Sequence, residues 1–161
     1  MNFESAYVLT MLGEWNVIVP LFLVLGYFWV RYGGERGRAQ ARALLVSITS
    51  TQIFVHLVKY LVARPRPALG LIDESGFSFP SGHAAIAVAF WGLACLFLYQ
   101  KIRKPFYKFI FIVLSVMIVA GIGLSRLYFV VHYPSDVIAG YLFGLACASA
   151  SYFYYLKSQK A

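Results

Sequence analysis

Five apolar stretches occupy most of this 161-residue chain, over approximately residues 16–30, 43–62, 84–100, 106–125 and 136–156. About 20 apolar residues in a helix cross the hydrocarbon core of a bilayer. The first stretch is short for this, but Trp15 and Trp29 could anchor its ends. Any one stretch could be a buried helix of a soluble protein, yet a mean hydropathy of +0.73 leaves too little polar surface for a soluble globule. The sequence therefore predicts an all-α integral membrane bundle of about five transmembrane helices.

The first fifteen residues carry an apolar residue at every fourth position: Phe3, Tyr7, Met11 and Trp15. In a helix these residues form one stripe, and Glu4 and Glu14 are the only charged residues of the segment. We expect an interfacial amphipathic helix here, with a sixth, partial span as the alternative. No basic region precedes the first apolar run and no small-residue cleavage site follows it, so no signal peptide is predicted.

The net charge of +8 is distributed as a membrane topology signal rather than as a nucleic-acid surface. Ten cations fall on one side of a five-span chain: Arg31, Arg36, Arg38, Arg42, Lys101, Arg103, Lys104, Lys108, Lys157 and Lys160. The positive-inside rule places these ten in the cytoplasm. The N-terminus and the loops that follow the second and fourth spans are then outside, and the C-terminus is inside.

The chain has no repeat, low-complexity tract or linker, so residues 1–161 are predicted to form a single membrane-embedded domain. The glycine-rich segment 31–40 is expected to be a turn, and residues 63–79 a non-helical loop. Gly140 and Gly144 are spaced for close approach of a neighbouring helix, within the chain or, as the alternative, in a dimer. Cys95 and Cys147 each lie inside an apolar stretch and are expected to be packing residues.

Residues Pro80-Ser81-Gly82-His83 precede the third apolar stretch and form a potential anion site. Proline suits the first position of a helix, so we expect the helix to begin here, with free backbone N–H groups and its positive dipole end. Gly82 would let an oxyanion approach the backbone, and the Ser81 hydroxyl could donate a hydrogen bond. His83 could transfer a proton. Pro-Ser-Gly is also an ordinary turn, so this cluster alone is weak.

A second histidine precedes the fifth stretch. Pro134 is expected to start that helix and Asp136 to lie in its first turn, where the helix dipole favours a carboxylate. Asp136 could then accept a hydrogen bond from one ring nitrogen of His132, which would leave the other nitrogen as a nucleophile. The alternative is that Asp136 only stabilises the helix end and that His132 is a surface residue.

Cations at the ends of the apolar stretches complete the polar set. Lys59, Arg66 and Arg126 could bind phosphate oxygens, or could instead extend their charged ends to the membrane surface. Arg64 could equally contact lipid headgroups, and we expect its replacement by alanine to be mild. His56 lies one turn before Lys59; we expect an interior hydrogen-bonded residue, with a contact to the site as the alternative.

The clusters have the order and spacing Lys-x6-Arg-Pro, Pro-Ser-Gly-His and Ser-Arg-x5-His-x3-Asp. In this the chain resembles a compact membrane member of the type 2 phosphatidic acid phosphatase superfamily, over about residues 59–136. The matching positions are Lys59, Arg66, Pro67, Pro80, Ser81, Gly82, His83, Ser125, Arg126, His132 and Asp136. Three motifs in the correct order are far more specific than any one of them.

The resemblance implies a phosphatase that needs no metal and no cofactor. His132 would attack phosphorus, Asp136 would orient it, and His83 would protonate the leaving alkoxide and then activate water. The phosphoryl oxygens would be held by Lys59, Arg66, Ser81, Gly82 and Arg126. The six acidic residues of the chain also offer too few well-placed carboxylates for a two-metal site.

A site at the outer membrane surface suits a lipid phosphate, and the resemblance implies a compact enzyme of the bacterial inner membrane with a periplasmic site. Candidate substrates are lipid A 1-phosphate, undecaprenyl pyrophosphate, phosphatidylglycerophosphate and phosphatidic acid. Two alternatives are a lipid phosphotransferase and a non-catalytic scaffold. The sequence does not determine the oligomeric state.

Overall fold

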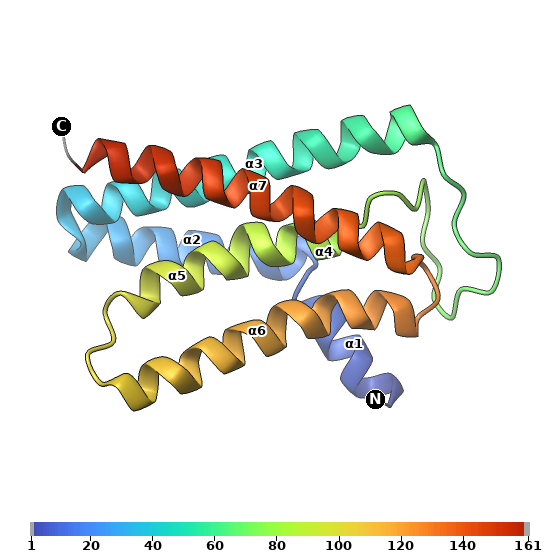
Figure 1. The fold of residues 1–161 in the computed structure, drawn as a ribbon, viewed down its shortest axis with the longest axis horizontal. Helices are drawn as coiled ribbons and strands as arrows, with labels where there is room; N and C mark the ends of the chain where they lie inside the picture. The colour runs from blue at the N-terminus through green and yellow to red at the C-terminus, as the bar shows by residue number, and fades with distance from the viewer. Residues whose placement is uncertain (1, 160–161) are drawn as a thin grey trace.

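The computed structural model describes residues 2–159, and in this part of the chain all regular elements are helices (Figure 1). They are α1 (Phe3–Met11), α2 (Trp15–Tyr32), α3 (Gly34–Val62), α4 (Gly82–Ile86), the π-helix η1 (Ala87–Gly92), α5 (Leu93–Tyr99), α6 (Pro105–Tyr128) and α7 (Pro134–Ser158). Because α4, η1 and α5 run on without a break, residues 2–159 contain five helices of membrane-spanning length and hydropathy. This confirms the predicted all-α bundle.

The helix from Gly82 to Tyr99 lies at the centre of the bundle. Half of its residues are buried, compared with 17–33% in the best membrane window of each of the other four long helices. Phe90 and Phe97 are fully buried on this helix and belong to the main apolar core. The outer helices leave large apolar side chains exposed, among them Ile53 and Phe109. Because the apolar surface lies on the outside of the bundle, the chain is an integral membrane protein.

The junction of α2 and α3 is tighter than the predicted turn over residues 31–40. Gly33 alone separates the two helices, and Gly34, with a φ of +58°, makes the reversal. Gly37 is already helical, and a Cβ atom there would lie 2.0 Å from the Trp29 carbonyl oxygen. The prediction was wrong for residues 31–32, which belong to α2, and for residues 34–40, where Gly37 allows close helix packing and is not part of the turn.

Close packing joins α7 to α4. A Cβ atom on Gly140 would lie 2.4 Å from the Ser81 carbonyl oxygen, and one on Gly144 would lie 2.2 Å from that of Ala85. The Ser81 N–H also donates a hydrogen bond of 2.9 Å to the carbonyl oxygen of Asp136. The two glycines therefore pack helices within the chain, and this contact brings the second and third sequence motifs together.

The N-terminal helix α1 packs against α6, and its nine residues span about 14 Å, less than half of a bilayer core. Ala6 and Thr10 are buried, whereas Phe3 and Tyr7 remain half exposed. The helix ends at Met11 and α2 begins after a short turn, so the predicted stripe does not continue into α2. Its length agrees with an interfacial helix rather than a sixth span.

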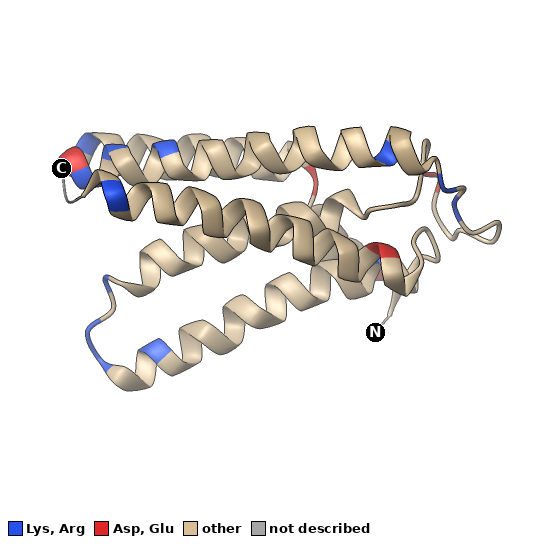
Figure 2. Ribbon diagram, turned by 45° about the horizontal axis from the view of Figure 1, so that its top comes forward, with Lys and Arg blue, Asp and Glu red and all other residues tan. Residues whose placement is uncertain are grey.

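Charged residues gather at the two ends of the bundle (Figure 2). One end holds the junction of α2 and α3, the loop between α5 and α6 and the end of α7, where nearly all of the ten predicted cytoplasmic cations lie; Lys160 is outside the described residues. The other end holds Lys59 and the long loop of residues 63–81, which is non-helical as predicted. The sequence motifs meet at this second end.

Candidate active site

A cavity of about 310 Å³ lies where α3, the loop 63–81, α4 and the link between α6 and α7 come together. Of the predicted site residues, the structure places Lys59, Arg66, Gly82, His83 and His132 in its wall. The other three predicted site residues do not line the cavity and are fully buried: Ser81, Arg126 and Asp136. The structure therefore brings all three motifs to one place, although they extend over residues 59–136.

The central helix begins two residues later than predicted, at Gly82 and not at Pro80. Pro80 follows a cis peptide bond and lies outside the helix, Ser81 is the N-cap, and α4 starts at Gly82. The Ser81 hydroxyl accepts the N–H of Ala84 at 3.5 Å, so it is used first as a helix cap. A Cβ atom on Gly82 would meet only Val55, at 3.7 Å, which leaves open space in front of the first turn of the helix.

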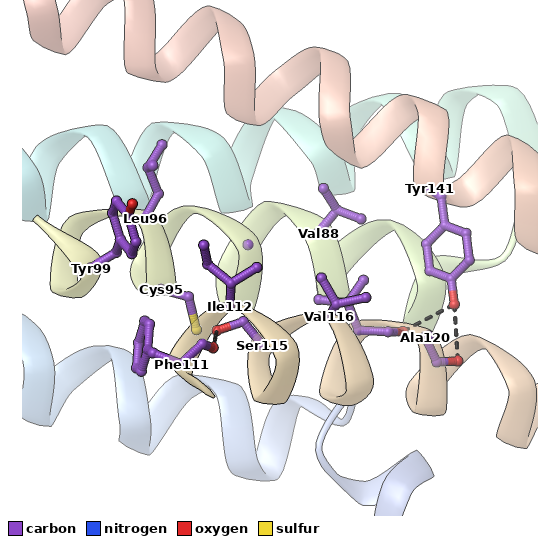
Figure 3. A pocket seen from close by; sticks show the side chains of 12 residues that line it. Val88, Cys95, Leu96, Tyr99, Phe111, Ile112, Ser115, Val116, Ala120 and Tyr141 are labelled. Atoms are coloured by element: carbon purple, nitrogen blue, oxygen red, sulfur yellow. Dashed lines mark hydrogen bonds between the residues drawn. The ribbon is translucent and has the colours of Figure 1, made fainter. Parts of the chain in front are cut away.

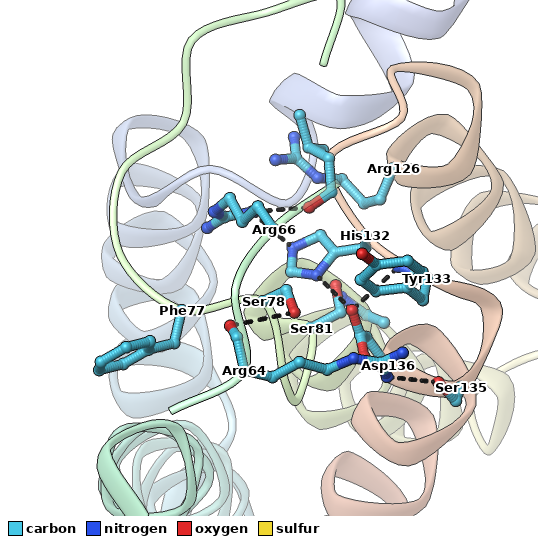
Figure 4. Close-up of polar contacts among 12 residues, drawn as sticks. Arg64, Arg66, Phe77, Ser78, Ser81, Arg126, His132, Tyr133, Ser135 and Asp136 are labelled. Carbon is cyan, nitrogen blue, oxygen red and sulfur yellow. Dashed lines mark hydrogen bonds and ion pairs between the residues drawn. The ribbon is translucent and has the colours of Figure 1, made fainter. Parts of the chain in front are cut away.

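His132 lies in the link between α6 and α7 and is 4% exposed. Its Nε2 atom is 3.2 Å from Nη1 of Arg66, and its Nδ1 atom is 3.5 Å from Oδ2 of Asp136 (Figure 4). Burial, and then the positive charges of Arg66 and Arg126, hold the pKa of His132 far below its usual range. The imidazole is therefore neutral at physiological pH. A proton on Nδ1 would face Asp136, although Nδ1 forms no hydrogen bond within the described residues, and the Nε2 lone pair would then accept from Nη1 of Arg66 on the cavity side.

Asp136 is the third residue of α7 and is fully buried. Its Oδ2 atom accepts the backbone N–H of Tyr133 at 2.9 Å, and its Oδ1 atom accepts Nη1 of Arg64 at 2.8 Å. The Arg64 guanidinium also lies over the ring of Tyr133, 4.0 Å from its centroid, and donates to the hydroxyl of Ser135. The role of Arg64 was left open by the sequence; the structure places its guanidinium on the carboxylate next to His132, and not only at the membrane surface.

Arg126 is fully buried at the end of α6 and is paired on two sides. Its Nη1 atom donates to the hydroxyl of Thr10 at 2.5 Å, and its Nη2 atom donates to Oε1 of Glu74. The other oxygen of Glu74 lies 3.4 Å from Nη2 of Arg66. One carboxylate thus bridges the two arginines that the sequence assigned to phosphate. The Nε atom of Arg126 has no hydrogen-bond partner within the described residues.

His83 lies in the first turn of α4, and its Nε2 atom is 2.9 Å from Oε1 of Glu14. This hydrogen bond holds the pKa of Glu14 below its usual range, so Glu14 is ionised at neutral pH. Gly13 also packs against the imidazole, since a Cβ atom there would come within 2.9 Å of it. The turn between α1 and α2 therefore fixes the His83 ring, a role that the sequence gave no sign of.

Two residues of α3 complete the wall of the cavity. The ammonium of Lys59 donates to the backbone carbonyl of Phe77, which ties the loop 63–81 to the end of the helix. His56 is exposed and faces the cavity, with its Nδ1 atom 2.9 Å from the carbonyl of Gln52. The expectation of an interior His56 is wrong, because the helix turns this residue toward the cavity and not toward the core.

Glu14, Glu74 and His83 also present ligand atoms within 4.8 Å of one another, close enough for a metal ion. Each carboxylate already has another partner, His83 for Glu14 and two arginines for Glu74. Positive side chains next to this group oppose a further cation and favour an anion instead.

The chain is similar to a known protein family and to several of its members. Residues 40–160 match the PAP2 superfamily. Phosphatidylglycerophosphatase B of Bacillus subtilis (strain 168) is 30% identical over 142 residues, which cover 85% of this chain and 67% of that protein. The lipid A 1-phosphatase of Rhizobium etli is 32% identical over 166 residues, 88% of this chain and 66% of that protein. The chain thus spans about two thirds of the length of these curated relatives.

Two crystal structures have the same fold. The transmembrane PAP2 type phosphatidylglycerolphosphate phosphatase from Bacillus subtilis superposes with a TM-score of 0.84 at 27% identity, covering 96% of this chain and 76% of that one. LpxE of Aquifex aeolicus superposes with a TM-score of 0.70 at 27% identity, covering 92% and 84%. A helical membrane bundle with this cluster of histidines and cations defines a membrane lipid phosphatase. The chain belongs to the PAP2 superfamily, which confirms the family predicted from the three motifs.

Proposed function

We propose that this chain hydrolyses a lipid phosphate monoester or pyrophosphate, without a metal ion, through a phosphohistidine on His132. The observation that carries the proposal is the state of this residue. A buried, neutral imidazole has one nitrogen near the Asp136 carboxylate and the other at a cavity lined by cations. Such an imidazole is a nucleophile whose charge in the phosphorylated state the carboxylate can balance.

In the first step the Nε2 lone pair of His132 forms a bond to phosphorus, and the bond between phosphorus and the lipid oxygen breaks. The departing oxygen takes the electron pair and a proton from His83. Glu14, held on Nε2 of His83, balances the charge that the ring carries while it is protonated. In the second step water gives its proton to His83 and attacks phosphorus. The bond between phosphorus and Nε2 of His132 then breaks, and inorganic phosphate leaves.

The cations would bind the phosphoryl oxygens. Arg66 and Lys59 face the cavity directly, and Arg126 would become available when the substrate phosphate takes the place of the Glu74 carboxylate. Movement of Arg66 onto a phosphate oxygen would also uncover Nε2 of His132, which it contacts at 3.2 Å in the free protein. Substrate binding and release of the nucleophile are thereby linked.

A second cavity, of about 670 Å³, supports a lipid as the substrate. It lies between α2 and α3, is lined mainly by apolar side chains and shares Trp15, Gln52 and His56 with the site cavity. A headgroup at His132 could therefore continue into an apolar tail held between two membrane helices. We propose lipid A 1-phosphate, undecaprenyl pyrophosphate, phosphatidylglycerophosphate and phosphatidic acid as candidates; the relatives include a phosphatidylglycerophosphatase and a lipid A 1-phosphatase.

We propose further that the site faces the exterior of a bacterial inner membrane. The concentration of lysine and arginine at the opposite end of the bundle supports this orientation (Figure 2). In a protein whose Cys95 and Cys147 are replaced by alanine, single cysteines at Ser75 and Lys101 test it. A membrane-impermeant maleimide should label the cysteine at position 75 in intact cells and not the one at position 101; the reverse pattern would contradict the orientation.

The test of the function is phosphate release from a panel of these lipids by purified protein in detergent, with EDTA present. We expect release that EDTA does not affect and that His132→Ala abolishes, while Arg31→Ala, at the far end of the bundle, retains it. Trapping of acid-labile, base-stable phosphate on the wild-type protein would identify the phosphohistidine. Turnover of wild type and His132→Ala at equal rates would refute the mechanism.

Phosphotransfer to a second lipid is the alternative outcome of the same intermediate. Free phosphate in equal amount to the substrate lost supports hydrolysis, and a deficit that appears as a new lipid phosphate supports transfer. If no lipid in the panel reacts by either route, the result would support the alternative that the chain is a non-catalytic membrane scaffold.

A further inference from the structure

A third cavity lies between α5 and α6, away from the active site. Its volume is about 580 Å³, and side chains from η1, α5, α6 and α7 line it (Figure 3). It shares no lining residue with the site cavity. The lining is apolar apart from Ser115, Cys95 and the hydroxyls of Tyr99 and Tyr141, and Ser115 and Tyr141 already donate to carbonyls of α6. We call this cavity the α5–α6 groove.

The groove has the length of one lipid chain in one leaflet. The groove runs along α5 and α6, whose ribbons separate toward their connecting loop (Figure 1). Its wall on α6 runs from Phe111 to Ala120, about 14 Å at 1.5 Å per residue, close to half of a bilayer core of about 30 Å. Ile112 and Val116 of this wall are also exposed on the outer surface of the bundle, so an acyl chain can enter from the bilayer.

Four cations lie in or next to the loop that joins α5 and α6, at the end of the groove where Tyr99 lies: Lys101, Arg103, Lys104 and Lys108. The ammonium of Lys108 lies over the ring of Tyr99, which lines the groove, at 4.7 Å from the centroid. None of the four forms an ion pair with a carboxylate in residues 2–159. At the same end of the bundle Arg38 pairs with Glu35, and Arg36 donates to Tyr155 and Gln100. The mouth of the groove therefore carries positive charge that the protein itself does not balance.

We propose that the α5–α6 groove binds an anionic phospholipid, with one acyl chain between the helices and the phosphate against Lys104 and Lys108. A lipid whose headgroup has a net negative charge balances these cations, whereas the amine of a zwitterionic lipid would be repelled by them. The bound lipid braces α5 against α6. Because α5 continues through η1 into α4, the same lipid supports the helix that carries His83 at its other end.

Native mass spectrometry of the purified full-length protein tests the proposal, with dioleoyl phosphatidylglycerol and dioleoyl phosphatidylcholine as probes and inorganic phosphate present to occupy the active site. We expect phosphatidylglycerol to bind at least tenfold more tightly. Lys104→Gln with Lys108→Gln should remove this preference. A matched pair, Arg31→Gln with Lys157→Gln, should keep it, since these two cations also lie over aromatic rings at the same end but away from the groove.

The apolar part of the site is tested by filling the groove. Val116→Trp, and as a smaller change Ile112→Phe, should each weaken phosphatidylglycerol binding at least tenfold while circular dichroism shows an unchanged helix content. Two variants are used so that the result does not depend on the folding of either one. Equal binding of the two lipids, equal losses in the two charge pairs, or unchanged binding in both filled variants would each overturn the proposal.

Discussion

Arg64 and Asp136, 72 positions apart in the sequence, are joined by a 2.8 Å ion pair between Nη1 and Oδ1. Asp136 is fully buried, and its other oxygen lies 3.5 Å from Nδ1 of His132. We propose that Arg64 fixes the carboxylate that orients the proposed nucleophile. Arg64 would then act through Asp136, as a positioning residue and not as a catalytic one.

We expect Arg64→Ala to lower kcat about tenfold to a hundredfold, the effect found for residues that orient the groups of a reactive site. The KM should change little, because Arg64 does not line the cavity. The stability cost should be about 1–3 kcal/mol, because the fully buried Asp136 loses its charged partner, although Arg64 itself is 36% exposed. Arg64→Lys keeps the charge and should recover part of the rate.

Arg31→Ala is the matched control for Arg64, because Arg31 also lies over a tyrosine ring, that of Tyr32, but at the far end of the bundle. Its kcat should be that of the wild type. Steady-state kinetics on the preferred lipid separate kcat from KM. A loss in Arg64→Ala that appears only in KM would show that Arg64 binds substrate and does not position Asp136.

Glu74 occupies the place of an anion between Arg66 and Arg126, and its neutralisation should favour other anions. In Glu74→Gln the neutral amide binds the guanidinium groups of Arg66 and Arg126 more weakly than the carboxylate does, so it competes less well with a bound anion. We therefore expect inorganic phosphate and vanadate to inhibit about tenfold more strongly than in the wild type. The free protein should lose stability, by about 3 kcal/mol at most, because the buried Arg126 loses its charged partner.

Asp73→Asn removes the neighbouring charge, which is exposed and makes no ion pair in the described chain, and should change neither inhibition nor stability. Inhibition constants for phosphate on the two variants provide the measurement. Weaker inhibition of Glu74→Gln would mean that Glu74 holds the arginines in position for phosphate and does not compete with it.

The variant Gly82→Ala tests whether the substrate phosphate binds in the open space at the start of α4. Alanine there meets only Val55 at 3.7 Å in the free protein and is a better helix former, so Gly82→Ala should fold with at least wild-type stability. The added methyl group would occupy the approach of a phosphoryl oxygen to the backbone. We expect kcat/KM to fall at least tenfold while the Tm stays within about 3 °C.

Gly26→Ala provides the comparison, since a Cβ atom there meets nothing within 4 Å and Gly26 lies on α2, outside the site. It should retain full activity. Full activity of Gly82→Ala as well would place the phosphate away from the first turn of α4.

Much of the site was predictable because its residues lie at the ends of apolar helices. Counting spans puts Lys59, His83 and His132 on one side of the membrane, and the glycine spacing in α7 indicated a close helix contact. The partners Glu74 and Arg64 were not predictable. They lie in the loop 63–81, whose path depends on tertiary hydrogen bonds and has no periodicity in the sequence.

Two hydrogen bonds illustrate how that loop is held. The Ser78 N–H donates to the carbonyl of Arg64, and the Leu71 N–H donates to the carbonyl of Phe129 at the end of α6. The small number of acidic residues was the only signal in the sequence that could have pointed to Glu74. The chain has six, so any acidic residue near Arg66 and Arg126 was a candidate partner.

His132 gives the stability of the protein a defined dependence on pH. Its folded-state pKa lies far below the usual value of about 6.5, because burial and the cations around it outweigh Asp136, which Arg64 already neutralises. Between these two pKa values the unfolded chain binds a proton that the folded protein does not. The free energy of unfolding should therefore fall as the pH drops below about 6.5, by at most about 1.4 kcal/mol per pH unit from this residue.

The variant His132→Asn retains a polar side chain of similar size and removes this titration. Thermal unfolding in detergent at pH 7 and pH 5.5 should therefore show a larger decrease of Tm in the wild type than in the variant, by about 2–4 °C. The range stays above pH 4.5 because the pKa of Glu14 is lowered by His83, so its stabilising charge is lost only in more acidic solution. Equal decreases of Tm in the two proteins would mean that folding does not lower the pKa of His132. That result would contradict an imidazole that burial and the surrounding cations keep neutral over this pH range.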